Sequence, residues 1–445
     1  MIPLTLPGRA CSPACSSLQT VTRDRLVSST ASCLRSPRLS SSLSRNRNPH
    51  LLASIRLPSR RTFHSTSSLG SDSPSRISYR VAVSSSGKGR RFHPIKNAYN
   101  FDPYVQDALG LVTEDKNPAV RRKNRPDSGE DAFFVSRVGR KDPGPVAFAV
   151  ADGVGGWTES KVDPADFSHG LCSYMAKSAL SWDSAPEKLR AKNLLQMGYD
   201  QVVADDSVRA GGSTASVGVG TNDGRVELAN LGDSGSVLLR LAAVHHYSTP
   251  QTHGFNTPYQ LSIIPPRMRK QASIFGGAFL EDFPRDAAVT NVRMQHGDVL
   301  MLATDGVFDN LNNQDILKII TNRMILTGAW NATPERITVS DNLEQLTGPE
   351  GLASILPSPP PPPPQSSENT PKPTNTSSGD QTYALQSLLA ASVAREAKLA
   401  SMDLRRDGPF AKEAQRYYPG DWYRGGKVDD ICVLIVVAVE EGHGL

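Results

Sequence analysis

A series of short apolar runs constrains the fold of this chain more than any other feature of its sequence. The runs are rich in valine, are bounded by Gly, Asp or Asn, and lie at 132–135, 146–151, 214–219, 226–229, 237–241, 299–303 and 431–439. Each has the length and composition of a buried β-strand. Helices are expected at about 163–181, 186–206, 313–325 and 382–400. Consecutive strands, with the helices grouped separately, predict an α+β fold rather than a doubly wound parallel sheet.

The patterned sequence forms one domain, which we expect to span residues 98–440. A segment at about 347–381 interrupts this domain and contains a run of prolines from Pro359 to Pro364. Its composition cannot bury enough apolar surface to fold, so we expect a disordered insertion. A ligand for SH3 or WW domains is the alternative interpretation of the proline run. Residues 72–97 are polar and rich in Gly and Ser, and are expected to form a linker.

Residues 1–71 have the composition of an organelle transit peptide. They hold ten arginines, no lysine and one acidic residue, so the formal charge of +5 for the chain comes from this tail. Transit peptides are rich in Arg and Ser and poor in acids. The stretch from Arg60 to Phe63 is similar to fungal mitochondrial processing sites. We expect a mitochondrial presequence and a location in the matrix. The alternatives are a chloroplast transit peptide and a disordered arginine-serine arm that binds RNA or acidic protein.

Charge, hydropathy and cysteine content argue against several other classes of protein. Beyond residue 71 there are 39 basic and 43 acidic residues, which leaves no positive excess for a nucleic-acid partner. No apolar run reaches the roughly 20 residues that cross a bilayer. Only Cys172 and Cys432 lie outside the presequence, and two distant thiols provide neither a disulfide framework nor a metal cluster. We expect a monomer without a transmembrane segment.

Acidic residues stand at the ends of four of the apolar runs. They are Glu130-Asp131, Asp152-Gly153, Asp305-Gly306 with Asp309 shortly after, and Asp429-Asp430. Clustered carboxylates repel one another unless cations lie among them. Oxygen ligands without histidine or cysteine favour Mg²⁺ or Mn²⁺. Two such ions can share a hydroxide nucleophile and stabilise an in-line phosphoryl displacement.

Other catalytic motifs are absent from the sequence. The stretch Gly87-Lys88-Gly89 lacks the Ser or Thr of a nucleotide-binding phosphate loop. Haloacid-dehalogenase phosphatases need two aspartates separated by one residue. Here the positions two before Asp152 and Asp305 hold Val150 and Ala303 instead of aspartate. No Gly-x-Ser-x-Gly elbow accompanies a His/Asp pair.

Six motifs, in this order, resemble those of the type 2C metal-dependent protein phosphatases. They are Gly129-Glu130-Asp131, Val150 to Trp157, Gly212 to Ala215, Leu231 to Gly235, Ala303 to Asp309 and Asp429-Asp430-Ile431. The resemblance covers about 98–440. Within the family the chain is most similar to the mitochondrial branch of fungi and animals, because of Phe255 to Leu261, Pro409-Phe410-Ala411 and the import signal.

The resemblance implies a fold and a set of site residues. The fold is two antiparallel sheets packed as a sandwich and flanked by helices, with two Mn²⁺ or Mg²⁺ ions at one edge and, in some relatives, a weaker third. The implied metal-binding residues are Asp152 as the bridge, the Gly153 carbonyl, Asp305, Asp429, Glu130 and Asp131, with Asp233 and Asp309 toward the third ion. Asp430 is expected to support these ligands, and Ser213 and Thr214 to be structural.

Two departures from the family pattern affect the implied catalytic residues, Asp152 and a phosphate-binding arginine. Many relatives place that arginine where this chain has Pro126. Arg125, one position away, is therefore the candidate, with Lys123 in reserve. Many relatives also have a histidine where this chain has Val154, which cannot act as a general acid.

The sequence thus predicts a serine/threonine protein phosphatase that hydrolyses mitochondrial phosphoproteins with a metal-bound hydroxide and without a phosphoenzyme. The alternative is a catalytically inactive phosphatase fold that binds phosphoproteins as a regulator. The acids at Asp152, Asp305 and Asp429 favour the enzyme. The physiological substrate, the choice between Mn²⁺ and Mg²⁺, and the proton donor do not follow from the sequence.

Overall fold

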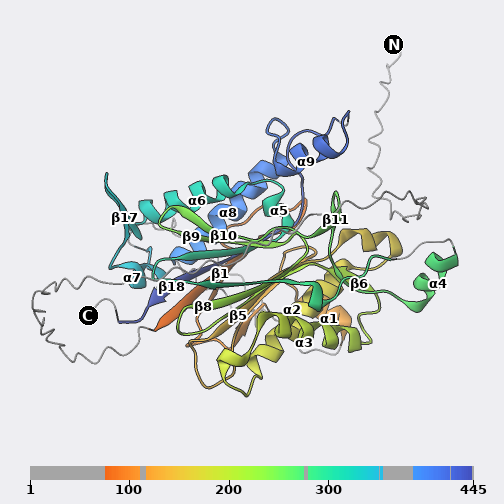
Figure 1. Cartoon of the computed structure of the whole chain (residues 1–445), viewed down its shortest axis with the longest axis horizontal. Coiled ribbons are helices and arrows are strands. Elements are labelled where there is room, and N and C mark those ends of the chain that lie inside the picture. Colours follow the sequence, from red (N-terminus) through yellow and green to blue (C-terminus); the bar gives the residue numbers. More distant parts are fainter. Residues whose placement is uncertain are drawn as a thin grey trace, which may run out of the picture. The chain divides into compact units, whose positions relative to one another are not determined.

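Two six-stranded antiparallel sheets form the centre of the protein (Figure 1). The computed structural model describes residues 76–110, 117–274, 279–349, 351–353, 384–420 and 422–442. The first sheet has the order β10-β9-β15-β18-β1-β2 and the second β14-β8-β7-β5-β4-β3. The first contains β1 (Ile77–Ser86), β2 (Ala98–Phe101), β9 (Gly235–Arg240), β10 (Ala243–Tyr247), β15 (Val299–Ala303) and β18 (Ile431–Glu440). The second contains β3 (Ala108–Leu109), β4 (Asp131–Arg137), β5 (Val146–Asp152), β7 (Ala215–Gly220), β8 (Arg225–Leu231) and β14 (Ala288–Arg293).

The main core lies between the two sheets and takes alternate residues from their strands. It joins Val81 and Leu434 of the first sheet to Phe133 and Phe148 of the second. Because successive side chains of a strand point to opposite faces, the intervening residues of β18 face the other way. They pack against α8 (Leu385–Met402). Burial on both faces explains why β18 is a continuous apolar run rather than an alternating one.

Helices cover the outer face of each sheet. The helices α6 (Asn313–Leu326) and α8 pack on the first sheet, whereas α2 (Pro164–Leu180) and α3 (Ala191–Ala204) pack on the second, as Figure 1 shows. Side chains cap the N-termini of two of these helices. At α2 the Asp163 side chain accepts a hydrogen bond from the backbone N of Ala165, and at α6 Asn312 forms a capping box. The predicted α+β sandwich is confirmed.

Smaller elements complete the described part of the chain. They are α1 (Pro118–Lys123), α4 (Pro266–Ile274), α5 (Asp305–Phe308), α7 (Leu343–Thr347), α9 (Pro409–Tyr417), β6 (Gly211–Ser213), β11 (Thr252–Gly254), β12 (Thr257–Pro258), β13 (Leu261–Ile263), β16 (Trp330–Ala332) and β17 (Ile337–Val339), with 3-10 turns at Gly155–Ser160, Pro186–Lys188 and Pro284–Asp286. No helix among the described residues is long and apolar enough to span a bilayer.

The expected linker at 72–97 is wrong for the residues that the structure describes. Strand β1 begins at Ile77 and lies between β18 and β2 in the first sheet, pairing with β18 over ten residues. The run of serines at its end suggested exposure, but Ser84, Ser85 and Ser86 are buried. The folded domain therefore begins before residue 98. The presequence at 1–71 and most of the insertion at 347–381 lie outside the described residues.

Candidate metal centre

The acidic strand ends meet at one edge of the sandwich. In the second sheet Asp131, which begins β4, lies opposite Asp152, which ends β5. In the first sheet β15 runs antiparallel to β18, so that the residues after Ala303 lie beside those before Ile431. The chain thus brings Asp305, Asp429 and Asp430 to the same edge of their sheet.

A threonine joins the two sheets at this edge. The Thr304 hydroxyl donates to Asp131 Oδ2 at 2.7 Å and accepts from the Cys432 backbone N at 3.0 Å. Asp131 is buried, and its second oxygen, Oδ1, has no hydrogen-bond partner among the described residues. Burial, then the charge of Asp430, raises the pKa of Asp131 well above its usual range. Sequence reasoning did not single out Thr304, although it directly precedes an Asp-Gly pair.

The backbone of Asp152 is held by Thr214. Its backbone N donates to Thr214 Oγ1 at 3.3 Å, and its carbonyl accepts from Thr214 N at 2.9 Å. The Thr214 hydroxyl also contacts that of Ser234 at 2.7 Å. Burial, followed by the charges of Asp305 and Asp131, raises the pKa of Asp152 well above its usual range. Thr214 therefore holds the backbone of Asp152 in place.

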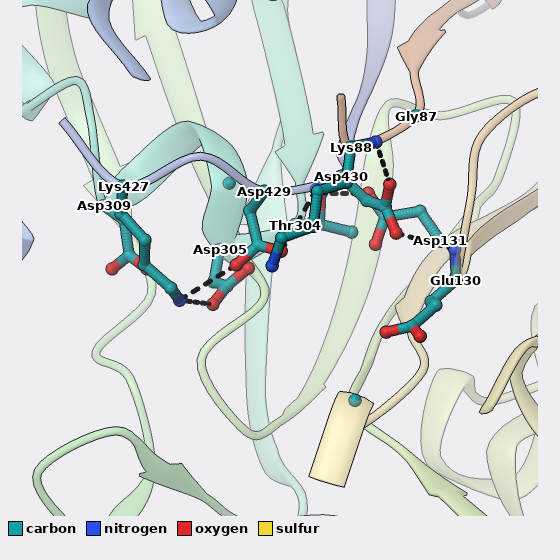
Figure 2. Close-up of polar contacts among 12 residues, drawn as sticks. Gly87, Lys88, Glu130, Asp131, Thr304, Asp305, Asp309, Lys427, Asp429 and Asp430 are labelled. Carbon is teal, nitrogen blue, oxygen red and sulfur yellow. Dashed lines mark hydrogen bonds and ion pairs between the residues drawn. The ribbon is translucent and has the colours of Figure 1, made fainter. Parts of the chain in front are cut away.

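Lys427, which sequence reasoning missed, lies among three of the predicted ligands. Its Nζ is 2.7 Å from Asp305 Oδ2, 2.6 Å from Asp309 Oδ2 and 3.1 Å from Asp429 Oδ2, and Figure 2 shows the side chain reaching toward these carboxylates. Burial alone would lower the pKa of Lys427, but Asp305 and the other two carboxylates raise it well above its usual range, so the ammonium stays charged. The signal that could have identified Lys427 is its place in the sequence, two residues before Asp429 at an acidic strand end.

Asp430 organises the loop that carries Glu130. Its Oδ2 accepts from the Glu130 backbone N at 2.7 Å, and its Oδ1 accepts from the Lys88 backbone N (Figure 2). These backbone donors occupy both oxygens, in keeping with the expected supporting role. Burial, then the charges of Asp430 and Asp429, raises the pKa of Glu130 to about 7.

Asp233 lies in the connection between β8 and β9, where the chain passes from the second sheet to the first. Its Oδ1 is buried and has no hydrogen-bond partner among the described residues. Burial, then the charge of Asp305, raises the pKa of Asp233 to about 7. This carboxylate therefore belongs to the same electrostatic cluster as Asp305.

Gly153 packs closely against two carbonyls at the end of β5. A Cβ at this position would lie 2.9 Å from the carbonyl oxygens of Glu130 and Pro164. The next residue, Val154, packs with Trp157 and Ile264 in a small apolar cluster. An imidazole at position 154 would therefore have to fit into apolar packing.

Arg125 is not a free cation in the structure. Its Nη1 donates to Asp163 Oδ2 at 3.0 Å, and its Nη2 binds Asp166. Both acids belong to the start of α2. Lys123, the reserve candidate, ends α1 and is exposed.

The donor set fits divalent cations on two observations. Burial, then the charges of neighbouring carboxylates, raises the pKa of Asp152 and of Asp233, and the buried oxygens Asp131 Oδ1 and Asp233 Oδ1 lack partners among the described residues. Cations between the acids would remove the repulsion and satisfy these oxygens. In the part of the chain that the structure describes, no three acidic, histidine or cysteine side chains already surround one point as metal ligands. Asp305, Asp309 and Asp429 instead contact the Lys427 ammonium.

With this fold and this centre, the chain belongs to the protein phosphatase 2C family, which residues 121–345 match. It is a protein-serine/threonine phosphatase. Its relatives place it in the branch that contains the PTC7 homologs.

Two relatives and one solved structure illustrate the similarity. "Protein phosphatase 2C homolog 7, mitochondrial" of Saccharomyces cerevisiae is 36% identical over 261 residues, or 58% of this chain and 73% of the yeast protein. "Protein phosphatase PTC7 homolog" of Xenopus laevis is 32% identical over 316 residues, or 70% of this chain and 82% of the frog protein. The X-ray structure of the photosystem II phosphatase PBCP has 24% identity and a TM-score of 0.46, covering 74% of this chain and 97% of that one.

Proposed function

We propose that this chain hydrolyses phosphoserine and phosphothreonine esters of mitochondrial proteins at the carboxylate centre. The observation that carries the proposal is the convergence of buried, mutually repelling carboxylates, two of whose oxygens have no partner among the described residues. Mn²⁺ or Mg²⁺ bound there would supply the positive charge that activates water and stabilises the phosphoryl oxygens. Two ions are proposed.

The residues proposed to hold the ions are those that the acidic strand ends supply. They are Asp152, Gly153 through its carbonyl, Asp305, Asp429, Glu130 and Asp131. Strand ends fix these groups, since the backbone on one side of each is locked in a sheet. Arg125 is proposed to bind the phosphate, for which its guanidinium has to exchange its ion pairs with Asp163 and Asp166.

Turnover of a phosphopeptide tests the metal centre. We expect residues 72–445 to release phosphate only with Mn²⁺ or Mg²⁺, because carboxylate oxygens bind these hard cations weakly and exchangeably. Full activity in excess EDTA would contradict the proposal. Binding of the phosphopeptide without any turnover would instead favour the regulator.

The presequence is proposed to direct the protein to the mitochondrial matrix. Its arginine-rich, acid-poor composition supports this, and the yeast relative carries "mitochondrial" in its name. A fusion of residues 1–75 to a reporter should enter mitochondria and become protected from added protease. The matched control replaces the ten arginines of residues 1–71 with glutamine and should stay in the cytosol. Cytosolic retention of the unchanged fusion would overturn the proposed location.

A further inference from the structure

We propose that Lys427 is a built-in cation of the metal centre. Its ammonium permanently occupies the point between Asp305, Asp309 and Asp429, and thereby keeps a third divalent ion out of this part of the site. The inference rests on the proposed metal centre and adds to it the number of ions that this chain can hold.

The contacts of the ammonium match its bonding capacity. An ammonium has three N–H donors, and Lys427 Nζ lies within 3.1 Å of a carboxylate oxygen on each of three aspartates. The ring of Phe410 covers a further side, with its centroid 4.9 Å from Nζ. Only 16% of the side chain is exposed. This environment resembles a filled cation site rather than a surface ion pair.

The backbone of Lys427 is fixed to the helix that carries two of the three acids. Asn310 accepts from Lys427 N at 2.9 Å and donates to Lys427 O at 2.9 Å. The same amide donates to the Gly306 carbonyl at 2.8 Å, within α5. Asn310 is buried. The lysine thus enters the cluster from an anchored segment, so that little conformational freedom is lost when its side chain binds the acids.

The ring of Phe410 is held beside Asp309, one of the three aspartates that contact Lys427. The Phe410 backbone N donates to the Asp309 carbonyl at 3.0 Å. Phe410 also packs against Phe255 and Tyr423, with ring centroids 5.1 Å apart in each pair. Lys427, the aspartates and the Phe410 ring are therefore connected by direct contacts.

The ammonium and the proposed ions do not compete for the same oxygen atoms. All three contacts of Lys427 use Oδ2 atoms. Lys427 makes no contact with the Oδ1 atoms of Asp305 and Asp429, although Asp429 Oδ1 accepts from the Asp430 backbone N at 3.2 Å and lies 3.3 Å from the exposed Lys88 Nζ. Asp309 commits its Oδ2 to Lys427. A divalent ion bound at Asp309 would lie beside a fixed positive charge and would be repelled. The third ion allowed by the family resemblance at Asp233 and Asp309 is therefore replaced by Lys427.

The number of bound Mn²⁺ ions in residues 72–445 tests this inference. We expect two ions in the wild type and a third, weaker one in Lys427→Met, whose unbranched side chain is one atom shorter and carries no charge. Lys427→Arg should still bind two. The matched control is Lys88→Met: Lys88 Nζ lies 3.3 Å from Asp429 Oδ1, but its side chain is 61% exposed, and the count should stay at two. Isothermal titration calorimetry and the electron paramagnetic resonance of free Mn²⁺ give the counts.

Three results would overturn the proposal. Three Mn²⁺ ions bound to the wild type would refute the role of Lys427 and leave the metal centre standing. Two ions in a folded Lys427→Met, judged by near-UV circular dichroism, would do the same. No bound Mn²⁺ in the wild type would refute the metal centre and the role of Lys427 together, so the two failures are distinguishable.

A measurement on the wild type serves if Lys427→Met does not fold. Amine-reactive labelling, read by mass spectrometry with and without Mn²⁺, reports whether the ammonium is accessible. We expect Lys427 to resist labelling in both states by at least ten-fold relative to the exposed Lys88. Labelling of Lys427 that rises to the level of Lys88 when Mn²⁺ binds would show that the ions displace the lysine, and would refute a permanent role.

Discussion

Replacement of Gly129 by alanine tests how the Glu130 loop is positioned. Gly129 has a φ of +71°, in the left-handed region that favours glycine. A Cβ at this position would lie 2.1 Å from Asp430 Oδ1. Because Asp430 holds the backbone N of both Glu130 and Lys88, the new methyl group would push away the carboxylate that fixes two loops.

The structure gives the size of the effect. Left-handed backbone costs an alanine about 1 kcal/mol, and each lost hydrogen bond to a charged group costs about 1.5–3 kcal/mol. With both hydrogen bonds of Asp430 lost, we expect Gly129→Ala to lower the free energy of unfolding by about 4–7 kcal/mol. Gly89 is the matched control, because its φ is +68° and no atom lies within 4 Å of its would-be Cβ. Gly89→Ala should cost about 1 kcal/mol.

Urea denaturation of residues 72–445, without metal, measures both changes. A double-mutant cycle with Asp430→Ala separates strain from contact. With the carboxylate absent, Gly129→Ala should cost no more than Gly89→Ala. The Mn²⁺ concentration for half-maximal activity should also rise in Gly129→Ala, since Glu130 moves with the loop. Equal losses of stability for Gly129→Ala and Gly89→Ala in the protein that keeps Asp430 would refute this account of the loop.

Three further predictions concern charge. Asp152→Asn should reduce phosphopeptide turnover by at least about 1000-fold and raise the urea midpoint of the metal-free protein, because one repelling carboxylate is removed; a lower midpoint would contradict this. The pKa values of Glu130 and Asp233 are about 7 in the folded protein and exceed those expected in the unfolded chain. The contribution of these two groups to the stability of the metal-free protein should therefore be greatest below about pH 4 and be lost as the pH rises through 7. Saturating Mn²⁺ should flatten this loss between pH 5 and 8, and a steeper loss with Mn²⁺ would refute the reasoning. Arg125→Met should raise the KM for a phosphopeptide by about 10-fold or more if its guanidinium binds phosphate, whereas an unchanged KM with lower stability would assign it to the ion pairs with α2.

The sequence predicted the strands and helices of the sandwich where their patterns were regular. β18 is apolar throughout because both of its faces are buried, and it was predicted at 431–439 against Ile431–Glu440 in the structure. Its partner β1 was missed because its buried serines resemble those of a linker. Nothing in a single strand's composition shows that a neighbouring helix will cover its polar end.

The sequence predicted the acidic residues of the candidate site but not the residues that hold them in place. Acids at strand ends are visible in the sequence, and topology alone brings them to one edge. Lys427 and Thr304 act through contacts across the sandwich or between separate loops. Sequence spacing gives no distance between such residues, so these partners could not be derived. The ion pairs of Arg125 with Asp163 and Asp166 could not be predicted for the same reason.

The position of β18 affects how the protein can be made. This strand inserts between β15 and β1 in the middle of its sheet, yet it follows both of them in the sequence. Until residue 440 has been synthesised, the sheet lacks a central strand, and the two flanking strands present unpaired edges that favour aggregation. A chain stopped before Asp429 would also lack part of the acidic cluster, so premature termination should yield an inactive polypeptide for proteolysis rather than a weak phosphatase. For a protein that crosses membranes unfolded, as the proposed presequence requires, the same delay keeps the chain open for a chaperone and a translocation channel.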